Sequence, residues 1–487
     1  MPIATQSRRL LRRRTKIVAT LGPASTAPGM IEKLIQAGVD VFRLNFSHGD
    51  HAGHEAAYHA VRGTAARLGM HTAVLADLSG PKIRTGRFEG GKVELAVGSK
   101  VTVTTRDVVG APGLIPSQYG ALAEDVKPGD RLLLDDGNLE LRVDGVEGPE
   151  IACTVVVGGT LKNKKGINLP GVAVSAPSLT EKDKDDARFC LGLGVDWLAL
   201  SFVRKGDDVR ELRALVDETG AGAAIVSKIE KPEALEHIED ILEASDGIMV
   251  ARGDLGVELP PERVPIAQSQ LVELARSRGK PVIVATQMME SMIANPRPTR
   301  AEVSDVAGAV WSGTDAVMLS AETASGAWPV QAVAMMDRVA RDAEAHLWTR
   351  GAFGGWTRQV AAAGAPLSVE EAVAHAATQL SRDLMVRAIV VFTRSGRSAT
   401  TVSAWRPQAP VLARSSREAT CRRLMLCWGV VPILGPDLEA GAFPAEARRL
   451  ALEAGLAEEG DAILQVSDFA ADPAENQPSV VVLRVTA

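Results

Sequence analysis

The fold is decided by the stretch AAIVSKIEKPEALEHIEDILEASDGIMVARGD, residues 223–254, in which two short apolar runs flank an amphipathic segment. Each run is rich in β-branched residues and apolar on both faces, which is typical of a parallel strand covered by helices. The same unit recurs along the chain. The apolar runs lie at 15–22, 40–47, 72–79, 197–203, 223–230, 247–254, 281–288 and 316–323. Eight strand–helix units predict a closed (β/α)₈ barrel, a TIM barrel.

Each apolar run turns polar at its last positions. These polar residues are Asn45, Ser47, Asp77, Ser201, Lys228, Glu230, Asp254, Thr286, Ser320 and Glu322. In barrels of this kind, side chains at the carboxyl ends of the strands point into one shared mouth. We therefore expect residues that are distant in the sequence to become neighbours there and to form the functional site.

The barrel pattern is interrupted after the third run. Residues 87–168 alternate apolar and polar positions between Gly and Asp turns, and predict a small, β-rich barrel inserted at the mouth as a lid. A Gly- and Ala-rich segment at 351–366 predicts a boundary, and an open α/β sheet domain is expected after it. The expected domains are a barrel at 1–86 and 169–350, the lid at 87–168, and an α/β domain at 366–487.

Composition excludes several classes of protein. The 54 Lys and Arg against 60 Asp and Glu give a net charge of −6, which argues against a nucleic-acid or anionic-membrane binder. No apolar run approaches the roughly 18 residues that span a bilayer. The 4 cysteines contain no C-x-x-C pair, which predicts reduced thiols in a cytosolic protein.

A basic run opens the chain and has two interpretations. Its cations are Arg8, Arg9, Arg12, Arg13, Arg14 and Lys16. A basic segment at this position is compatible with a short targeting signal. We favour a run that belongs to the folded chain, because a core strand is expected to begin at Thr15 and leaves no room for a cleavable leader.

Two acidic residues close neighbouring strands of the predicted barrel. Glu230 and Asp254 offer the hard oxygen ligands that Mg²⁺ prefers, although most acidic residues are simply solvated. Lys228 lies two residues before Glu230, on the same strand face. Its ammonium either stabilises developing negative charge or only neutralises the two acids, and spacing alone leaves both roles open.

Arginines and hydroxyls add to the predicted mouth. Arg43 and Arg84 are placed to hold a phosphate or carboxylate with two donors, or to form ion pairs at the rim. The segment ARGDLG at 251–256 offers backbone N–H groups to an anion where a helix begins. Thr286 and Ser320 suit orientation or proton relay, and ordinary strand-end hydrogen bonding explains them equally well.

Motifs along the chain, in their order, resemble the successive signatures of the pyruvate kinase family. They are FRLNFSHG (42–49), ADLSGPKIRTG (76–86), DDG (135–137), KKGINLPG (164–171), VSKIE (226–230), IMVARGDLGVELP (248–260), IVATQMMESM (283–292) and PTRAEVSDVAGAVWSGTDAVMLSAETASG (298–326). The resemblance covers nearly the whole chain. It implies a cytoplasmic enzyme that transfers the phosphoryl group of phosphoenolpyruvate to ADP, giving ATP and pyruvate.

The resemblance also implies how phosphoenolpyruvate is held. Glu230 and Asp254 would bind the Mg²⁺ that bridges the substrate, and Arg43 would hold its phosphoryl group. Backbone N–H groups around Gly253 and Asp254, together with Thr286, would hold its carboxylate.

For the chemical step, the resemblance implies that Lys228 neutralises charge on the moving phosphoryl group and on the enolate left behind. Thr286, with Ser320 and Glu322 through water, would protonate the enolate.

On the nucleotide side, the resemblance places four residues near the ADP phosphates, with a second Mg²⁺ arriving on the nucleotide. They are Asn45, His48, Arg84 and Lys165. Lys165 lies in the predicted lid, so lid closure would bring it over the phosphates. Without the resemblance, a solvated surface lysine would be the simpler interpretation of Lys165.

One departure from the family predicts a property. Many relatives bind K⁺ through residues matching Asn45, Ser47 and Asp77, and carry a glutamate at the position of Lys82. This chain has Leu78 and Lys82 instead. Our hypothesis is that the Lys82 ammonium supplies the charge of K⁺, so that potassium is not required. The alternative is a lysine paired with an acid at the rim.

The C-terminal domain contains a segment that resembles the family's allosteric effector loop. Its residues Thr393, Arg394, Ser395, Gly396, Arg397 and Ser398 would bind a phosphorylated activator, although helix capping alone explains the small residues. The segment 466–485 lacks the family's glycine-rich loop, so a sugar monophosphate or AMP is as strong an expectation as fructose 1,6-bisphosphate. A homotetramer is implied by resemblance only.

Two other functions compete with this interpretation. A barrel lyase or aldolase would also stabilise a pyruvate enolate with Mg²⁺ and arginine, but Lys228 and the lid argue against it. A metabolite-sensing protein with a decayed site is disfavoured, because every expected catalytic position is filled.

Overall fold

The computed structural model describes residues 13–349, 366–467, 469 and 476–486. Its centre is a closed parallel barrel in which strands follow one another in chain order and the last pairs with the first. The strands are β1 (Lys16–Thr20), β2 (Val41–Asn45), β3 (Ala73–Asp77), β12 (Trp197–Leu200), β13 (Ala224–Ile229), β14 (Gly247–Ala251), β15 (Val282–Ala285) and β16 (Ala316–Leu319). All eight predicted strands are confirmed.

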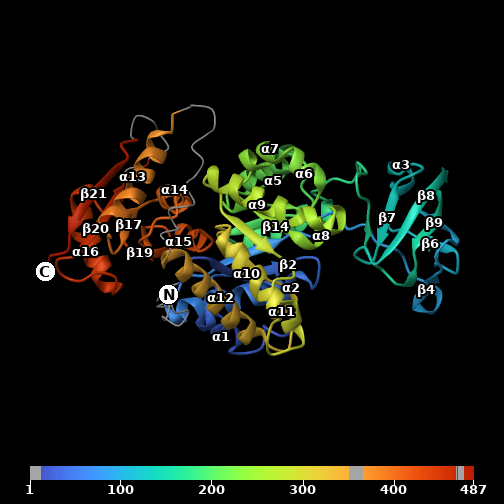
Figure 1. Ribbon diagram of the computed structural model, residues 1–487, viewed down its shortest axis with the longest axis horizontal. Coiled ribbons are helices and arrows are strands. Elements are labelled where there is room, and N and C mark those ends of the chain that lie inside the picture. Colours follow the sequence, from blue (N-terminus) through green and yellow to red (C-terminus); the bar gives the residue numbers. More distant parts are fainter. Residues whose placement is uncertain (1–12, 350–365, 468, 470–475, 487) are drawn as a thin grey trace.

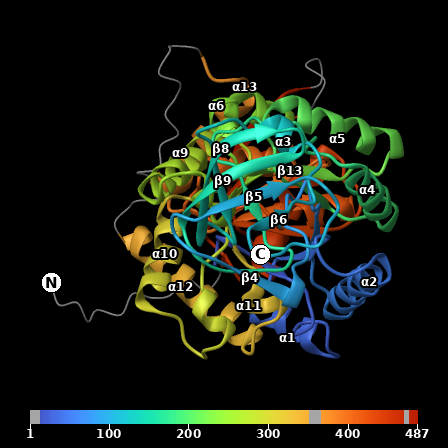
Figure 2. The same cartoon turned by 90° about the vertical axis from the view of Figure 1, so that its right-hand side faces the viewer.

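Helices surround the barrel, as the view from the lid side shows (Figure 2). They are α1 (Met30–Ala37), α2 (His51–Leu68), α4 (Glu181–Leu193), α5 (Gly206–Thr219), α6 (Pro232–Glu236), α7 (Ile238–Ala244), α8 (Arg252–Glu258), α9 (Val264–Ser277), α10 (Arg300–Trp311), α11 (Ala321–Ala324) and α12 (Pro329–Thr349). Capping boxes at Thr180 and Thr299 start α4 and α10, because each hydroxyl accepts an N–H that the first turn leaves unpaired. Short 3₁₀ turns lie at Pro261–Arg263 and Glu290–Ile293.

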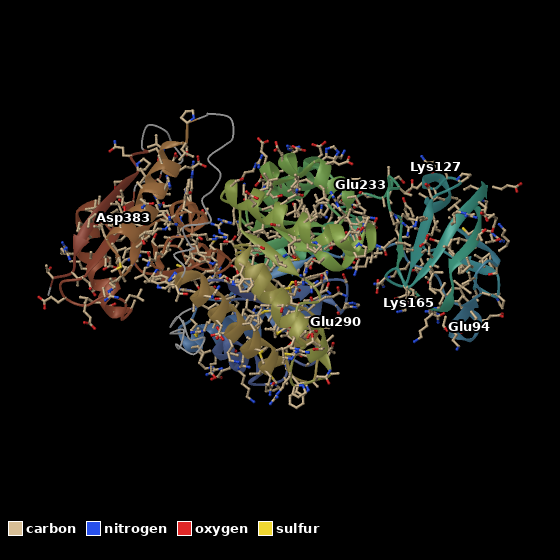
Figure 3. The ribbon with its side chains drawn as sticks, in the orientation of Figure 1. Glu94, Lys127, Lys165, Glu233, Glu290 and Asp383 are labelled. Atoms are coloured by element: carbon tan, nitrogen blue, oxygen red, sulfur yellow. The ribbon has the colours of Figure 1, made fainter. Side chains whose placement is uncertain are left out.

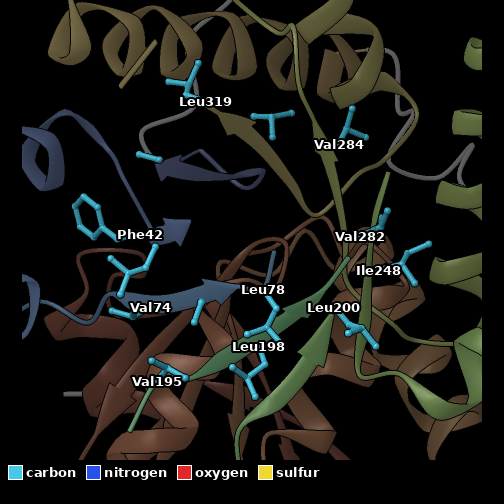
Figure 4. Close-up of a cluster of buried hydrophobic side chains, with 14 of the residues drawn as sticks. Phe42, Val74, Leu78, Val195, Leu198, Leu200, Ile248, Val282, Val284 and Leu319 are labelled. Atoms are coloured by element: carbon cyan, nitrogen blue, oxygen red, sulfur yellow. The ribbon is translucent and has the colours of Figure 1, made fainter. Parts of the chain in front are cut away.

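The two faces of each barrel strand enter different cores. Residues such as Phe42, Val74 and Ile248 point outward and pack under the helices (Figure 4). The alternate residues, including Val41 and Met249, fill the barrel interior. Strands buried on both faces explain why the sequence shows continuous apolar runs rather than alternation.

The lid is β-rich and lies at one end of the molecule (Figure 1). Its six-stranded sheet has the order β11-β7-β8-β9-β5-β6, and β10 pairs with β4. The strands are β4 (Lys92–Leu95), β5 (Lys100–Thr104), β6 (Leu114–Pro116), β7 (Arg131–Leu134), β8 (Leu139–Glu147), β9 (Glu150–Val157), β10 (Gly159–Lys162) and β11 (Ile167–Asn168). A 3₁₀ turn at Glu89–Gly91 and the short α3 (Leu122–Asp125) complete it around a separate apolar core.

The C-terminal domain lies at the opposite end from the lid (Figure 1). Its sheet has the order β19-β18-β17-β20-β21, and only β21 is antiparallel. The elements are α13 (Val369–Asp383), β17 (Ile389–Phe392), α14 (Arg397–Ala404), β18 (Val411–Ser415), α15 (Glu418–Leu424), β19 (Val430–Leu434), a 3₁₀ turn (Ala440–Ala442), α16 (Phe443–Glu453), β20 (Ala462–Ser467) and β21 (Ser479–Arg484). Apolar cores cover both faces of this sheet, as the predicted open α/β architecture requires. The predicted boundary at 351–366 lies almost entirely outside the described residues.

Four aspartates mark the amino-terminal ends of the barrel strands. Each aspartate lies just before the start of one barrel strand. Its carboxylate accepts an N–H from the first or second residue of the neighbouring strand that comes earlier in the chain. The pairs are Ile17 to Asp40 (2.8 Å), Val74 to Asp196 (2.8 Å), Ile225 to Asp246 (2.7 Å) and Val282 to Asp315 (3.2 Å). The C-terminal domain docks on two of them, through Arg406 on Asp315 at 2.9 Å and Arg422 on Asp196 at 2.8 Å. Its Met425 and Leu426 also pack into the inner core of the barrel.

The described part of the basic run belongs to this same end. Arg13 forms ion pairs with Asp40 at 2.9 Å and with Asp337 at 3.0 Å. Lys16, in β1, donates to the Val430 carbonyl of the C-terminal domain at 2.7 Å. These cations are therefore structural, whereas residues 1–12 lie outside the described part.

Other expectations concern the whole chain. Within the described residues, no helix combines the length and the apolarity needed to cross a membrane. All four cysteines are free and buried, as predicted. Burial raises the pKa of the Cys427 thiol to about 12, so this thiol is protonated and unreactive.

Candidate active site at the mouth of the barrel

The barrel interior leads directly to the polar mouth. Side chains alternate along a strand, so the inward-facing Val41, Leu75 and Val226 are followed, two residues on, by Arg43, Asp77 and Lys228. Pairing between β2 and β3 places Arg43 beside Leu75 and Asn45 beside Asp77. The polar residues that close the strands therefore converge because they continue the inner face.

Lys228 is the centre of this network. Its ammonium donates to Ser201 at 2.8 Å and contacts Glu230 at 2.8 Å and Asp77 at 3.3 Å. Burial alone would lower the pKa of Lys228, but the Asp77 and Glu230 carboxylates outweigh it and raise the pKa above the usual range. Lys228 is consequently a permanent, desolvated cation between the ends of three strands.

Ser201 was predicted only as a polar strand end, and the structure gives it a specific partner. Its hydroxyl donates to the Leu78 carbonyl at 2.7 Å and accepts from Lys228. The residue is 2% exposed. The sequence could have predicted this contact. Ser201 follows the inward-facing Trp197 and Ala199 at every second position, and Lys228 follows Val226 on the inner face in the same way.

Arg43 extends the network toward β1. Its Nε donates to Asp77 at 2.6 Å, and its Nη1 donates to the Thr20 hydroxyl at 3.0 Å. Burial would raise the pKa of Asp77, but Lys228 and Arg43 outweigh it and hold the pKa below the usual range. Asp77 is therefore an ionised acid that orients both cations.

Glu230 and Asp254 form the acidic side of the mouth. Glu230 is 1% exposed and accepts the Phe202 N–H at 2.7 Å, while Asp254 lies half-buried in the first turn of α8. Burial raises the pKa of Glu230, the cation of Lys228 opposes this shift, and the nearby Asp254 carboxylate adds to it. Two hard carboxylates that repel each other are a donor set that a divalent cation satisfies, so these residues fit Mg²⁺.

Thr286, Ser320 and Glu322 reach the mouth from β15 and β16. The Thr286 hydroxyl accepts the Gly253 N–H at 2.7 Å and donates to the Ala285 carbonyl at 2.6 Å. Glu322 is buried and accepts N–H groups of Ser320 at 2.7 Å and Met289 at 3.1 Å. Burial raises the pKa of Glu322. Glu322 thus bonds to the backbone of Ser320 and not to its hydroxyl.

The predicted nucleotide residues line two different cavities. Arg84 and Lys165 line a cavity of about 290 Å³ between the lid and the barrel, together with Asp254. Asn45 and His48 line one of about 950 Å³ over β1 and β2, which also includes Arg43, Thr20 and Ser320. Lys165 lies on the side of the lid that faces the barrel (Figure 3). Its ammonium forms an ion pair with Asp135 at 2.6 Å. The structure therefore brings these residues together only in pairs.

The predicted monovalent-cation region adjoins the network of Lys228, Asp77, Glu230 and Arg43, which we call the hub. Asp77 belongs to both. Asn45 accepts the Ser47 N–H at 3.1 Å, and Leu78 is fully buried. Lys82 lines the cavity of about 290 Å³. Desolvation and the cations of Lys228 and Arg84 lower the pKa of Lys82, while Asp77 and Asp254 oppose this shift. The Lys82 ammonium therefore lies within the electrostatic field of the hub.

The predicted effector loop joins β17 to α14. Gly396, with φ of 96°, donates its N–H to the Thr393 hydroxyl at 3.0 Å and caps α14. Thr393, Arg394, Ser395 and Ser398 line a cavity of about 510 Å³. Ser395, Gly396 and Arg397 also line a second cavity, of about 590 Å³, which faces the barrel. Asp468 and residues 470–475, in the segment that departs from the family, lie outside the described part.

Comparisons with known proteins agree with this architecture. Residues 12–333 match the family model "Pyruvate kinase, barrel domain" and residues 371–477 match "Pyruvate kinase, alpha/beta domain". The pyruvate kinase of Agrobacterium vitis is 46% identical over 477 residues, covering 97% of this chain and 98% of the relative. Pyruvate kinase 2 of Synechocystis sp. is 44% identical over 462 residues, covering 94% of this chain and 77% of the relative.

A solved structure gives the same result. The crystal structure of a pyruvate kinase from Cryptosporidium parvum matches with a TM-score of 0.90 and 36% identity, over 97% of this chain and 96% of that one. The family models together cover most of the chain, and the barrel, the additional sheet domains and the ordered motifs agree with them. This chain belongs to the pyruvate kinase family of phosphotransferases.

Proposed function

We propose that this protein transfers the phosphoryl group of phosphoenolpyruvate to ADP with Mg²⁺, without a requirement for potassium and under control of a phosphorylated metabolite. The observation that carries the proposal is the hub at the barrel mouth. There, one desolvated ammonium, Lys228, lies 2.8 Å from Glu230 and is joined through Asp77 to the Arg43 guanidinium. A phosphoryl group with its bound cation requires cations and hard acids at one place.

Glu230 and Asp254 would hold the Mg²⁺ ion. When bound, the ion would supply Lewis-acid stabilisation of negative charge on the phosphoryl and enolate oxygens. Glu230 would exchange part of its contact with Lys228 for the ion, since one of its oxygens now contacts that ammonium at 2.8 Å. This exchange would leave an N–H of Lys228 for a phosphoryl oxygen.

Lys228 and Arg43 would then bind the phosphoryl group. Among the described residues, Nε and Nη1 of Arg43 have partners and Nη2 has none, so Nη2 is available for a phosphoryl oxygen. Asp77 fixes both cations, so that their charge is oriented before substrate binds. Such preorganised charge stabilises the transition state more than the ground state.

Protonation of the enolate would come from the opposite side of the mouth. Thr286, with its hydroxyl held by Gly253, would deliver the proton, and Ser320 with Glu322 would supply it through water. Burial raises the pKa of Glu322, which is the direction that favours a carboxyl group able to hold and release a proton. The backbone N–H of Asp254, with others around it at the start of α8, would hold the substrate carboxylate, while the Gly253 N–H stays on the Thr286 hydroxyl.

Nucleotide binding would require movement of the lid. We propose three domains: the barrel, formed by 1–86 and 169–350, the lid at 87–168, and the α/β domain at 366–487. The lid would be the moving part. Arg84, Asn45 and His48 belong to the barrel segment and only Lys165 to the moving one, so closure would bring Lys165 over ADP phosphates that the other three residues hold. Lys165 would exchange Asp135 for phosphate. Closing the lid would also exclude water from the transfer.

Regulation and assembly belong to the same proposal. The cavity of about 510 Å³ beside Thr393, Arg394 and Ser398 would take a phosphorylated effector. We propose a cytoplasmic location, which the buried free thiols support, and a homotetramer, which rests on the resemblance to the family alone. Titrating AMP, a sugar monophosphate and fructose 1,6-bisphosphate against the phosphoenolpyruvate saturation curve would identify the effector, and light scattering would give the assembly.

The function is tested by incubating the protein with phosphoenolpyruvate, ADP and Mg²⁺ and measuring both products. ATP and pyruvate in equal amounts are expected. Pyruvate without ATP would indicate a lyase or a hydrolase, and no turnover would indicate a binding protein. Repeating the assay in tetramethylammonium buffer tests the Lys82 hypothesis, which a large gain in activity on adding K⁺ would reject.

A further inference from the structure

The backbone takes an unusual conformation just after β15. Thr286 has φ of +70° and Gln287 has φ of +54°, so two consecutive residues with side chains lie in the left-handed region. This region is unfavourable for residues with a Cβ atom, and most of all for a β-branched one such as threonine. Surrounding contacts are therefore needed to hold Thr286, whose hydroxyl is the proposed proton donor.

Arg252 provides those contacts. Its Nη2 donates to the Thr286 carbonyl at 2.7 Å and its Nε to the Ala285 carbonyl at 3.3 Å. Its Nη1 is anchored on Asp305 of α10 at 2.6 Å. The Arg252 side chain is only 11% exposed. One rigid guanidinium thus binds the carbonyls of Thr286 and the residue before it, and is itself held from the far side.

The residues that follow Arg252 act on the same threonine and on the metal. The Gly253 N–H donates to the Thr286 hydroxyl at 2.7 Å. A Cβ added at Gly253 would lie 3.4 Å from that hydroxyl oxygen, which shows how closely the two segments approach. Asp254, the next residue, is the proposed metal ligand. Arg252 and Gly253 therefore fix the backbone and the hydroxyl of Thr286, and the proposed metal ligand Asp254 lies in the same turn of α8.

We propose that Arg252 is a positioning residue for enolate protonation: it holds Thr286 in its left-handed conformation and thereby aims the hydroxyl at the enolate carbon. This inference rests on the proposed function, because it needs Thr286 to deliver the proton. A lysine cannot replace Arg252, since the contact uses a planar fork of donors and lysine offers a single ammonium on a flexible stem.

A different role for Arg252 would be a tether that only joins α8 to α10 through Asp305. The two roles predict different couplings. A tether would affect proton transfer equally with any residue at position 286. A positioning residue would matter only while residue 286 has an unfavourable backbone conformation and a side-chain hydroxyl. Glycine adopts the left-handed conformation freely, so Thr286→Gly removes both the hydroxyl and the need for support.

The experiment is a double-mutant cycle on the full chain with Arg252→Lys and Thr286→Gly. The first measurement is ATP formation from phosphoenolpyruvate and ADP. The second is exchange of the pyruvate methyl protons in D₂O with ATP and Mg²⁺ present, followed by NMR, which reports proton transfer directly. We expect Arg252→Lys to slow methyl exchange about 100-fold, the effect of a small misplacement at a reacting centre. In the Thr286→Gly background, we expect the same change to slow residual exchange less than about threefold.

Equal slowing in both backgrounds would overturn the proposal in favour of the tether. Asp305→Asn serves as a second variant in the same cycle if Arg252→Lys does not fold, because it keeps the guanidinium and removes only its anchor. We expect a smaller slowing of about tenfold from it, again only when Thr286 is present. Thr286→Gly that exchanges at the wild-type rate would also overturn the inference, while leaving pyruvate kinase activity in place. Absence of ATP formation by the wild-type protein would instead reject the proposed function.

Discussion

The two ends of the barrel use buried charge in opposite ways. At the amino-terminal ends, each of the four aspartates accepts a strand N–H and pairs with a nearby arginine, as Asp315 does with Arg406 at 2.9 Å. At the mouth, Glu230 and Asp254 lie close enough to repel each other, and the cations of Lys228 and Arg84 lower the pKa of Lys82. The first arrangement is complete within the chain and joins two domains. The second has like charges left to be balanced by ligands, which is typical of a functional site.

Replacing Lys228 should give the largest effect and separate the two ends most clearly. Lys228→Met is expected to lower kcat for ATP formation about 1,000-fold, because it removes preorganised charge from the transferring phosphoryl group. Lys16→Met is the matched control, since Lys16 is also a buried lysine of a barrel strand, 7% exposed and 3.7 Å from Asp40, but lies at the opposite end of the barrel. Steady-state kinetics with both variants checks this, and a loss below tenfold for Lys228→Met would contradict the central role of the ammonium.

The corresponding change at the other end should affect stability instead of chemistry. Arg406→Met removes the cation that is hydrogen-bonded to the buried Asp315 at 2.9 Å, and we expect the free energy of unfolding to fall by about 3–5 kcal/mol. Arg422→Met is the control, because Asp196 keeps Arg62 at 2.6 Å, and a smaller loss is expected. Urea denaturation measures both. A large fall in kcat of folded Arg406→Met without loss of stability would show that this end also acts in catalysis.

A charge reversal at Lys82 tests whether the mouth carries its own monovalent cation. Lys82→Glu is expected to lower activity in potassium-free buffer about tenfold. Adding K⁺ should restore the activity, because the ion would then supply the positive charge that the mutation removes. Activity is measured across a K⁺ titration with tetramethylammonium as the balancing ion. Lys82→Glu that stays active without K⁺ would refute the substitution hypothesis.

A pH effect at His48 should be the smallest. Desolvation and the cations of Lys82, Arg84 and Arg43 lower the pKa of His48 below the ordinary histidine value of about 6.5, so His48 is predominantly neutral as pH falls from about 8 to about 7. The KM for ADP is therefore expected to be flat over this interval and to change only below it. Lys82→Glu would raise the pKa of His48 and move that change to higher pH. A KM that varies across the interval in the wild type would contradict this assignment.

The sequence alone predicted the eight barrel strands, because strands buried on both faces leave continuous apolar runs that end in polar residues. It also predicted that Lys228, Glu230 and Arg43 meet, since the carboxyl ends of parallel strands share one mouth. Their identification with a family required the ordered motifs. Local patterns therefore determined the architecture and the main residues of the candidate site.

Only the tertiary structure decided which side chains pair. The clamp of Arg252 on Thr286, the bond of Ser201 to Lys228 and the docking of Arg406 on Asp315 join residues far apart in the chain. Arg84 and His48 line two different cavities, although both follow neighbouring barrel strands. No periodicity encodes such contacts, because hydrogen bonds depend on distances of a few ångströms that are set only when the whole chain has packed.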